Sequence, residues 1–134
     1  MSVIDEVNSA AVVVRVANRD RTVEWFRETL GLAPVLVATD GAEHPIALYR
    51  VCGLNFAVWQ LAPGVTRDRA ENKRNSFVTM THPDPRSAHD TLVAAGAEVG
   101  PVSGSEHHVF FYLHDPDGNR YEITSPPTAS YADK

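Results

Sequence analysis

The stretch YLHDPDGNRYEI, residues 112–123, decides how this chain folds. Its middle, residues 115–119, consists of Asp, Pro, Gly and Asn, and the Asp-Gly step suits the positive φ angles of a tight hairpin turn. Residues 108–113 and 120–124, on either side, are rich in the β-branched and aromatic side chains that favour strands. The stretch therefore predicts an antiparallel β-hairpin.

The segment before this hairpin predicts a strand, a helix and a further short strand. Residues 77–81 are strand-like. Asp84 and Pro85 are typical of a helix start, because an Asp side chain caps free N–H groups and proline fits the first helical position. Apolar residues at helical spacing follow until Gly96, and a short strand is expected at 98–102. The order is strand, helix, strand, strand, strand.

The first half of the chain repeats this order. A β-branched strand is expected at 11–16, and a helix runs from the cap at Asn18 to Gly31. Three strands are then predicted at 34–38, 44–51 and 54–61. Asn18 matches Asp84 in this comparison, and Gly31 matches Gly96. The pattern indicates an internal duplication of a βαβββ module in a chain of class α+β.

A polar segment separates the two halves. It carries charges of both signs, Pro63 and Gly64, and no hydrophobic period. We interpret it as a loop at 63–74 that joins module 1 (about 9–62) to module 2 (about 75–127). Together they form a single domain covering 1–134, and the residues after 127 are expected to be loose.

Composition narrows the classes of function. The formal charge of the 134 residues is −5, with no basic stripe, which argues against nucleic-acid binding. No apolar run reaches the roughly 20 residues of a membrane span, and no signal peptide is evident. The single cysteine, Cys52, cannot form a disulfide within the chain and is expected to be buried near a turn. A cytoplasmic protein without membrane or nucleic-acid partners is the expectation.

Two motifs carry a resemblance to a known family. The stretch VANRDRTVEWF at 16–26, followed by LGL at 30–32, resembles the opening of the vicinal oxygen chelate (glyoxalase, bleomycin-resistance and extradiol dioxygenase) superfamily. Residues 112–123 resemble the family's terminal signature more closely, and the likeness extends over about 11–126. It implies two βαβββ modules whose sheets curve into a half-barrel cleft, a small-molecule ligand or substrate, and a homodimer.

The resemblance also implies where a metal would bind. Metal-dependent members hold a divalent ion with His, Gln and Glu side chains on the first and last strands of each module. The matching positions here are Ala11, Val58 (or Trp59, if a bulge shifts the register), Phe77 and Glu122. Only Glu122 can bind a metal, so we expect a degenerate metal site and no cofactor.

Histidines offer a second route to a metal. His107 and His108 are adjacent on a strand, so only one of them can face the cleft. The family's alternation selects His108, which is expected to be a hydrogen-bonding wall residue. The alternative is a divalent metal shared by His108 and Glu122.

The expected cleft is apolar and aromatic, which suits a flat, partly apolar ligand. The candidate ligand-binding residues are Tyr49, Val58, Trp59, Phe77, His108, Phe110 and Tyr112. Plain core packing is the alternative for such alternating aromatic residues.

Glu122 has two interpretations. It could be a general base, because apolar surroundings disfavour the charged form of a carboxylate. It could instead be a structural residue paired with Arg50 or Arg120. The sequence therefore predicts metal-independent binding of an aromatic or polycyclic molecule. The alternative is an enzyme (lyase, isomerase, epimerase or dioxygenase) that uses Glu122 as a base or as a metal ligand. An interaction module is a third possibility that no feature of the sequence supports.

Overall fold

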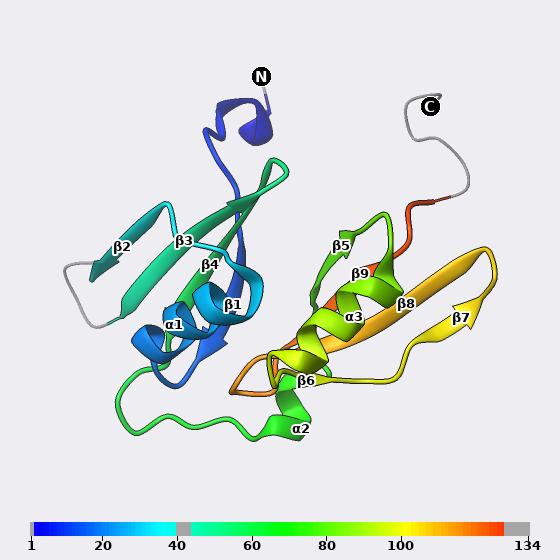
Figure 1. The fold of residues 1–134 in the computed structure, drawn as a ribbon. Helices are drawn as coiled ribbons and strands as arrows, with labels where there is room; N and C mark the ends of the chain where they lie inside the picture. Colours follow the sequence, from blue (N-terminus) through cyan, green and yellow to red (C-terminus); the bar gives the residue numbers. More distant parts are fainter. Residues whose placement is uncertain (1, 40–43, 128–134) are drawn as a thin grey trace. The chain divides into compact units, whose positions relative to one another are not determined.

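A computed structural model describes residues 2–39 and 44–127 of the chain (Figure 1). The chain divides into two compact units, Met1–Thr66 (unit 1) and Arg67–Lys134 (unit 2). Each unit contains one small open sheet with a helix packed on it, so the predicted α+β class is confirmed. Within the described residues, no helix has the length and apolarity needed to cross a membrane.

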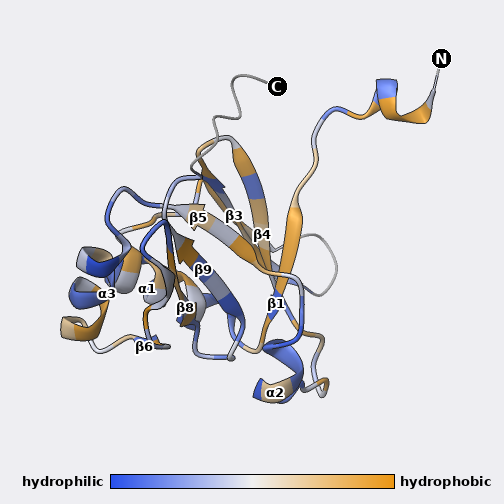
Figure 2. Ribbon diagram, turned by 90° about the vertical axis from the view of Figure 1, so that its right-hand side faces the viewer, coloured by the Kyte–Doolittle hydropathy of each residue, from blue (hydrophilic) through white to orange (hydrophobic). Residues whose placement is uncertain are grey.

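Unit 1 begins with a short 3-10 helix that was not predicted, η1 (Val3–Glu6). The predicted elements follow in the predicted order: β1 (Val12–Val16), α1 (Arg19–Leu30), β2 (Leu36–Thr39), β3 (Pro45–Val51) and β4 (Leu54–Gln60). The strands form sheet A in the order β1-β4-β3-β2, with β1 parallel to β4 and the other pairs antiparallel. In Figure 2, β1 is hydrophobic over most of its length.

Helix α1 begins and ends where the sequence predicts. The Asn18 side chain accepts a hydrogen bond from the Arg21 backbone N–H at 3.0 Å. Gly31 has a φ of 66°, a backbone conformation that residues other than glycine rarely adopt. From α1, Phe26 packs on one face of sheet A, with its ring centroid 4.8 Å from Tyr49 and 5.7 Å from Phe56. This aromatic cluster is the core of unit 1.

Unit 2 contains α2 (Arg69–Asn72), β5 (Val78–Thr81), α3 (Pro85–Ala94), β6 (Glu98–Val99), β7 (Ser103–Ser105), β8 (His108–His114) and β9 (Arg120–Thr124). Sheet B has the order β5-β9-β8-β6, with β7 also paired to β8. The side chain of Asp84 caps α3 as predicted, accepting from the Ser87 backbone N–H at 3.2 Å. Helix α3 packs against β6 and β8 (Figure 1).

Two features of unit 2 differ from the sequence prediction. The strand expected at 98–102 ends already at Val99, because Pro101 has no N–H to donate to a ladder, and a further short strand, β7, follows at Ser103–Ser105. The segment expected to be a plain loop contains α2, which begins at the cap residue Asp68. The side chain of Asn72 is buried and donates to the Asp117 carbonyl at 2.8 Å. The polar segment from residue 67 therefore belongs to unit 2.

The hairpin at residues 115–119 is built around a buried carboxylate. Asp115 is fully buried and accepts hydrogen bonds from the backbone N–H groups of Asp117 and Asn119, from Asn119 Nδ2 and from the Tyr121 hydroxyl. Burial raises the pKa of Asp115 to about 6, against the lowering effect of these donors. The connection has five residues, and Gly118 provides its positive φ of 84°. It is longer than the tight turn that the Asp-Gly step predicts.

The turn between β3 and β4 also differs from what the sequence predicts. Cys52 is exposed, not buried, and has a φ of 50°. This left-handed conformation is unusual for a residue with a side chain, and it is found in tight hairpin turns. The C-terminal residues expected to be loose lie outside the described part of the chain.

Candidate functional site

Sheet B has one face under α3. In the described part of unit 2 the opposite face, which we call the open face, has a helix nearby only at its His114 end, where Arg69 of α2 contacts Glu98. The ring of Phe111 contacts His89 of α3, and Leu113, Tyr121 and Ile123 are buried on the same side. Side chains alternate along strands, so the intervening residues lie on the open face. They are His108, Phe110, Tyr112 and His114 on β8, Arg120, Glu122 and Thr124 on β9, and Thr79 and Thr81 on β5.

Glu122 lies at the centre of the open face. Strand β9 runs between β5 and β8, so Glu122 has Thr79 as its neighbour on one side and Tyr112 on the other. The Thr79 hydroxyl donates a hydrogen bond to Glu122 Oε1 at 2.5 Å. This bond orients a carboxylate toward whatever contacts the open face.

Neither arginine suggested by the sequence forms an ion pair with Glu122 in the described part of the chain. Arg50 belongs to unit 1 and donates from Nε to Asn55 Oδ1 at 2.9 Å. Arg120 lies over the ring of Tyr112, with Cζ 4.1 Å from the ring centroid. The proposed structural pairing of Glu122 is therefore not what the structure contains.

An aromatic row accompanies Glu122. The centroid of the Phe77 ring lies 5.7 Å from that of Tyr112, and the Phe110 centroid lies 5.8 Å from Tyr112 on the same strand. Both contacts are edge-to-face, the arrangement that the charge distribution of aromatic rings favours. Phe77 is 40 % exposed. The structure thus brings Phe77, Phe110 and Tyr112 together beside Glu122.

His108 is on the open face but far from Glu122. Its Nε2 lies 3.0 Å from Thr124 Oγ1, and its ring is 5.3 Å from Phe110. The strand register pairs Glu122 with Tyr112, four residues along β8 from His108, which is about 13 Å. The strand register therefore does not bring His108 and Glu122 together as the shared metal site would require. No group of three or more metal-binding side chains occurs among residues 2–39 and 44–127.

Two candidate residues of unit 1 are core residues. Tyr49 is fully buried against Phe26 of α1, and Val58 is fully buried on the same side of sheet A. The expectation that they line a cleft is wrong, because the register turns them toward the helix. Trp59 faces the other way, with Arg15 Cζ 5.6 Å from its ring centroid and the His44 ring stacked at 6.1 Å.

The register also relocates the position that corresponds to Glu122. Thr79 lies five residues before the helix cap Asp84, and Val13 lies five residues before the cap Asn18. Their partners on the central strands are Glu122 and Ala57. The counterpart of Glu122 in unit 1 is therefore Ala57 and not Val58 or Trp59.

Two residues of the open face were missed by sequence reasoning. Thr79 contacts Glu122 through the parallel pairing of β5 with β9, which no local pattern specifies. The sequence suggests Arg120 only as a counter-ion of Glu122, although its position two residues before Glu122 puts both side chains on one face of the strand.

Comparison with known proteins identifies the family. Residues 11–124 match the model of the glyoxalase-like domain, and the chain belongs to this family within the vicinal oxygen chelate superfamily. A search of curated proteins found no significant match.

Solved structures share the fold at low sequence identity. The glyoxylase/bleomycin resistance protein/dioxygenase domain from Frankia sp. EAN1pec is 17 % identical with a TM-score of 0.71, covering 93 % of this chain and 96 % of that one. The fosfomycin resistance protein FosX from Listeria monocytogenes is 10 % identical with a TM-score of 0.68, covering 91 % and 95 %. The bleomycin-binding protein from Streptomyces verticillus is 19 % identical with a TM-score of 0.64, covering 90 % and 97 %. These neighbours establish the fold. They include a bleomycin-binding protein and a fosfomycin resistance protein, so the fold alone does not fix the function.

Proposed function

We propose that this chain binds a small aromatic molecule on the open face of sheet B without a metal ion. The observation that carries the proposal is the row of Phe77, Tyr112 and Phe110 beside an oriented carboxylate. Aromatic rings bury a large area on a flat ligand, and one or two polar groups then fix its orientation. The bleomycin-binding neighbour has the same fold, which is compatible with this proposal.

Titration against a panel of planar aromatic compounds tests the proposal. Phe77→Ala removes an exposed ring with little effect on the core, so it should weaken binding about tenfold. Val93→Ala removes a similarly exposed apolar side chain from α3, away from the open face, and should leave the affinity unchanged. Absence of binding across the panel, or equal affinities for both variants, would contradict the proposal.

The second candidate function is enzymatic, with Glu122 as the proton acceptor. It is favoured by the Thr79 hydrogen bond, which orients the carboxylate through one of its two oxygens. Glu122→Gln should then abolish turnover of the substrate and change its affinity by less than about threefold. Elemental analysis of the purified protein tests whether such an enzyme depends on a metal. A stoichiometric divalent metal that is lost in Glu122→Ala would contradict the metal-free proposal.

A cytoplasmic location and a homodimer remain part of the proposal. The dimer is what the resemblance to the family implies, and the location rests on the single cysteine, which cannot form a disulfide within the chain. Light scattering coupled to size-exclusion chromatography gives the mass in solution, and a mass of one chain would refute the dimer.

A further inference from the structure

Arg120 lies on the open face in contact with an aromatic ring and without an ion pair to a described residue. Its guanidinium lies over the Tyr112 ring, with Cζ 4.1 Å from the centroid, and this cation–π contact stabilises its position on the sheet. Arg120 is two residues from Glu122 on β9, so the two side chains leave the same face about 7 Å apart.

The charge of Arg120 has no carboxylate partner among the described residues. Other arginines in the chain do form ion pairs, as Arg19 does with Asp20, Arg27 with Glu24 and Arg69 with Glu98. The Nε atom of Arg120 is buried and donates no hydrogen bond within the described structure. A guanidinium presents its N–H groups in a planar fork that matches a carboxylate or phosphate. The buried Nε is out of reach of a ligand, so contact with a ligand falls to the two terminal nitrogens of the guanidinium.

Two further cations, Arg69 and Lys73, lie near the strand partner of Arg120. His114 is its partner across β8 and β9, and both ring nitrogens of His114 are buried without a hydrogen bond from any described residue. Burial lowers the pKa of His114, and the nearby cations Lys73, Arg120 and Arg69 lower it further, while Glu98 raises it. Glu98 is the acidic group that acts on His114, and it already contacts Arg69, Lys73 and His114 Nδ1. It therefore does not neutralise Arg120 by an ion pair.

We propose that Arg120 recognises an oxyanion on the ligand of the open face, so that the ligand is an acidic aromatic molecule. The inference rests on the proposed function and adds the chemical class of the ligand. The acid group would accept hydrogen bonds from Arg120 while the aromatic body contacts Phe77 and Tyr112. Glu122, about 7 Å along the strand, would accept a hydrogen bond from a hydroxyl or amino substituent of the same ligand.

Two probes that differ only in charge test this inference. We would titrate the protein with 2-naphthoate and with 2-naphthamide, following amide chemical shifts by NMR. The naphthoate should bind about tenfold more tightly, because it adds a charge-assisted bidentate contact to the same aromatic burial. Its affinity should fall with added salt, whereas that of the amide should not.

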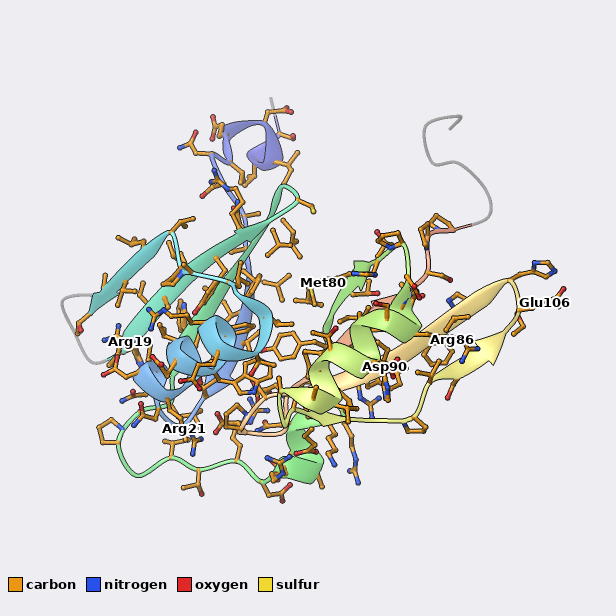
Figure 3. All side chains as sticks on the ribbon, in the orientation of Figure 1. Arg19, Arg21, Met80, Arg86, Asp90 and Glu106 are labelled. Atoms are coloured by element: carbon orange, nitrogen blue, oxygen red, sulfur yellow. The ribbon has the colours of Figure 1, made fainter. Side chains whose placement is uncertain are left out.

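Three variants locate the effect. Arg120→Gln should reduce naphthoate affinity to that of the amide and leave amide affinity within about twofold. Arg120→Lys, which keeps the charge but loses the planar fork, should give an intermediate affinity. Arg86→Gln makes the same change of charge on the exposed surface of α3 (Figure 3) and should leave both affinities unchanged. Spectra of each variant without ligand verify that it is folded.

The outcomes separate the two proposals. Equal binding of both probes, with no effect of Arg120→Gln, overturns the oxyanion inference and leaves aromatic binding intact. A preference for naphthoate that survives Arg120→Gln also overturns it, because another cation is then responsible. Failure of both probes to bind at millimolar concentration contradicts the proposed function and the inference together.

Discussion

The two units share one topology but differ in the chemistry of the sheet face opposite α1 or α3. In unit 2 the central row consists of Thr79, Glu122 and Tyr112, and in unit 1 the corresponding row consists of Val13, Ala57 and Leu48. The same backbone pairing therefore displays a hydrogen-bonded carboxylate in one unit and three apolar side chains in the other. A duplicated scaffold does not duplicate its site, because the register fixes positions and not residue types.

The hairpins differ in the same way. The β3–β4 turn of unit 1 contains only Cys52 and Gly53, both with positive φ. The corresponding turn of unit 2 has five residues that fold around the buried carboxylate of Asp115. Unit 2 therefore depends on a polar network where unit 1 depends on a short turn. The next three predictions test that contrast, from the largest expected effect to the smallest.

Asp115→Ala should be the most damaging change. It leaves four donors without an acceptor in a buried turn, so we expect a loss of about 3 kcal/mol in the free energy of unfolding. Urea denaturation measures the loss. Asp90→Ala, on the exposed surface of α3 (Figure 3), is the matched control and should change stability by less than about 0.5 kcal/mol. Similar losses for the two variants would show that the turn of unit 2 does not depend on its carboxylate.

The same carboxylate should make stability depend on pH. The pKa of Asp115 in the folded chain, about 6, lies above its ordinary value of 3.8, so the fold favours the protonated form. Its contribution to stability is greatest below pH 3.8, declines as the pH rises to about 6, and is constant above. The decline is at most about 3 kcal/mol, at 1.36 kcal/mol for each unit of pKa shift.

The difference in unfolding free energy between the unaltered chain and Asp115→Asn isolates this contribution, because all other groups titrate in both. We expect that difference to shrink as the pH is raised from 4 to 7. A difference that is independent of pH would mean that burial does not shift this carboxyl as described.

Two buried tyrosines give the smallest effect and a direct comparison of the units. The Tyr121 hydroxyl donates to Asp115 Oδ2 at 3.1 Å, whereas the buried Tyr49 hydroxyl has no hydrogen-bond partner among the described residues. Tyr121→Phe should therefore cost about 1 kcal/mol, and Tyr49→Phe should be neutral or slightly stabilising. Burial raises the pKa of Tyr49 to about 12, which agrees with a hydroxyl shut away from water. Equal losses of unfolding free energy for Tyr121→Phe and Tyr49→Phe would contradict this difference between the two cores.

Much of the fold could be predicted from local patterns. The caps Asn18 and Asp84, the glycine after α1 and the hairpin that ends in β9 are determined by neighbouring residues, and the structure has each of them. The helix α2 was not predictable in this way, because its stability comes from contacts with the distant turn at residues 115–119. Arg69 and Asn72 hydrogen-bond to the carbonyls of Pro116 and Asp117.

The candidate site was predictable only in part. Phe77, Phe110, Tyr112 and Glu122 do lie together, whereas Tyr49 and Val58 lie in the core of unit 1 and His108 is distant from Glu122. Alternation along a strand separates residues into two faces but does not say which face a helix covers. It also does not say which residues of neighbouring strands are opposite each other.

The sequence by itself determined the order of elements, the two modules and the family, because these depend on short-range periodicity, capping and turn residues. Only the tertiary structure decided that Thr79 orients Glu122, that Tyr112 supports Arg120, and that Ala57 stands where unit 1 would need a carboxylate. Each of these depends on the register between strands, which is set by pairing over distances of up to 44 residues along the chain.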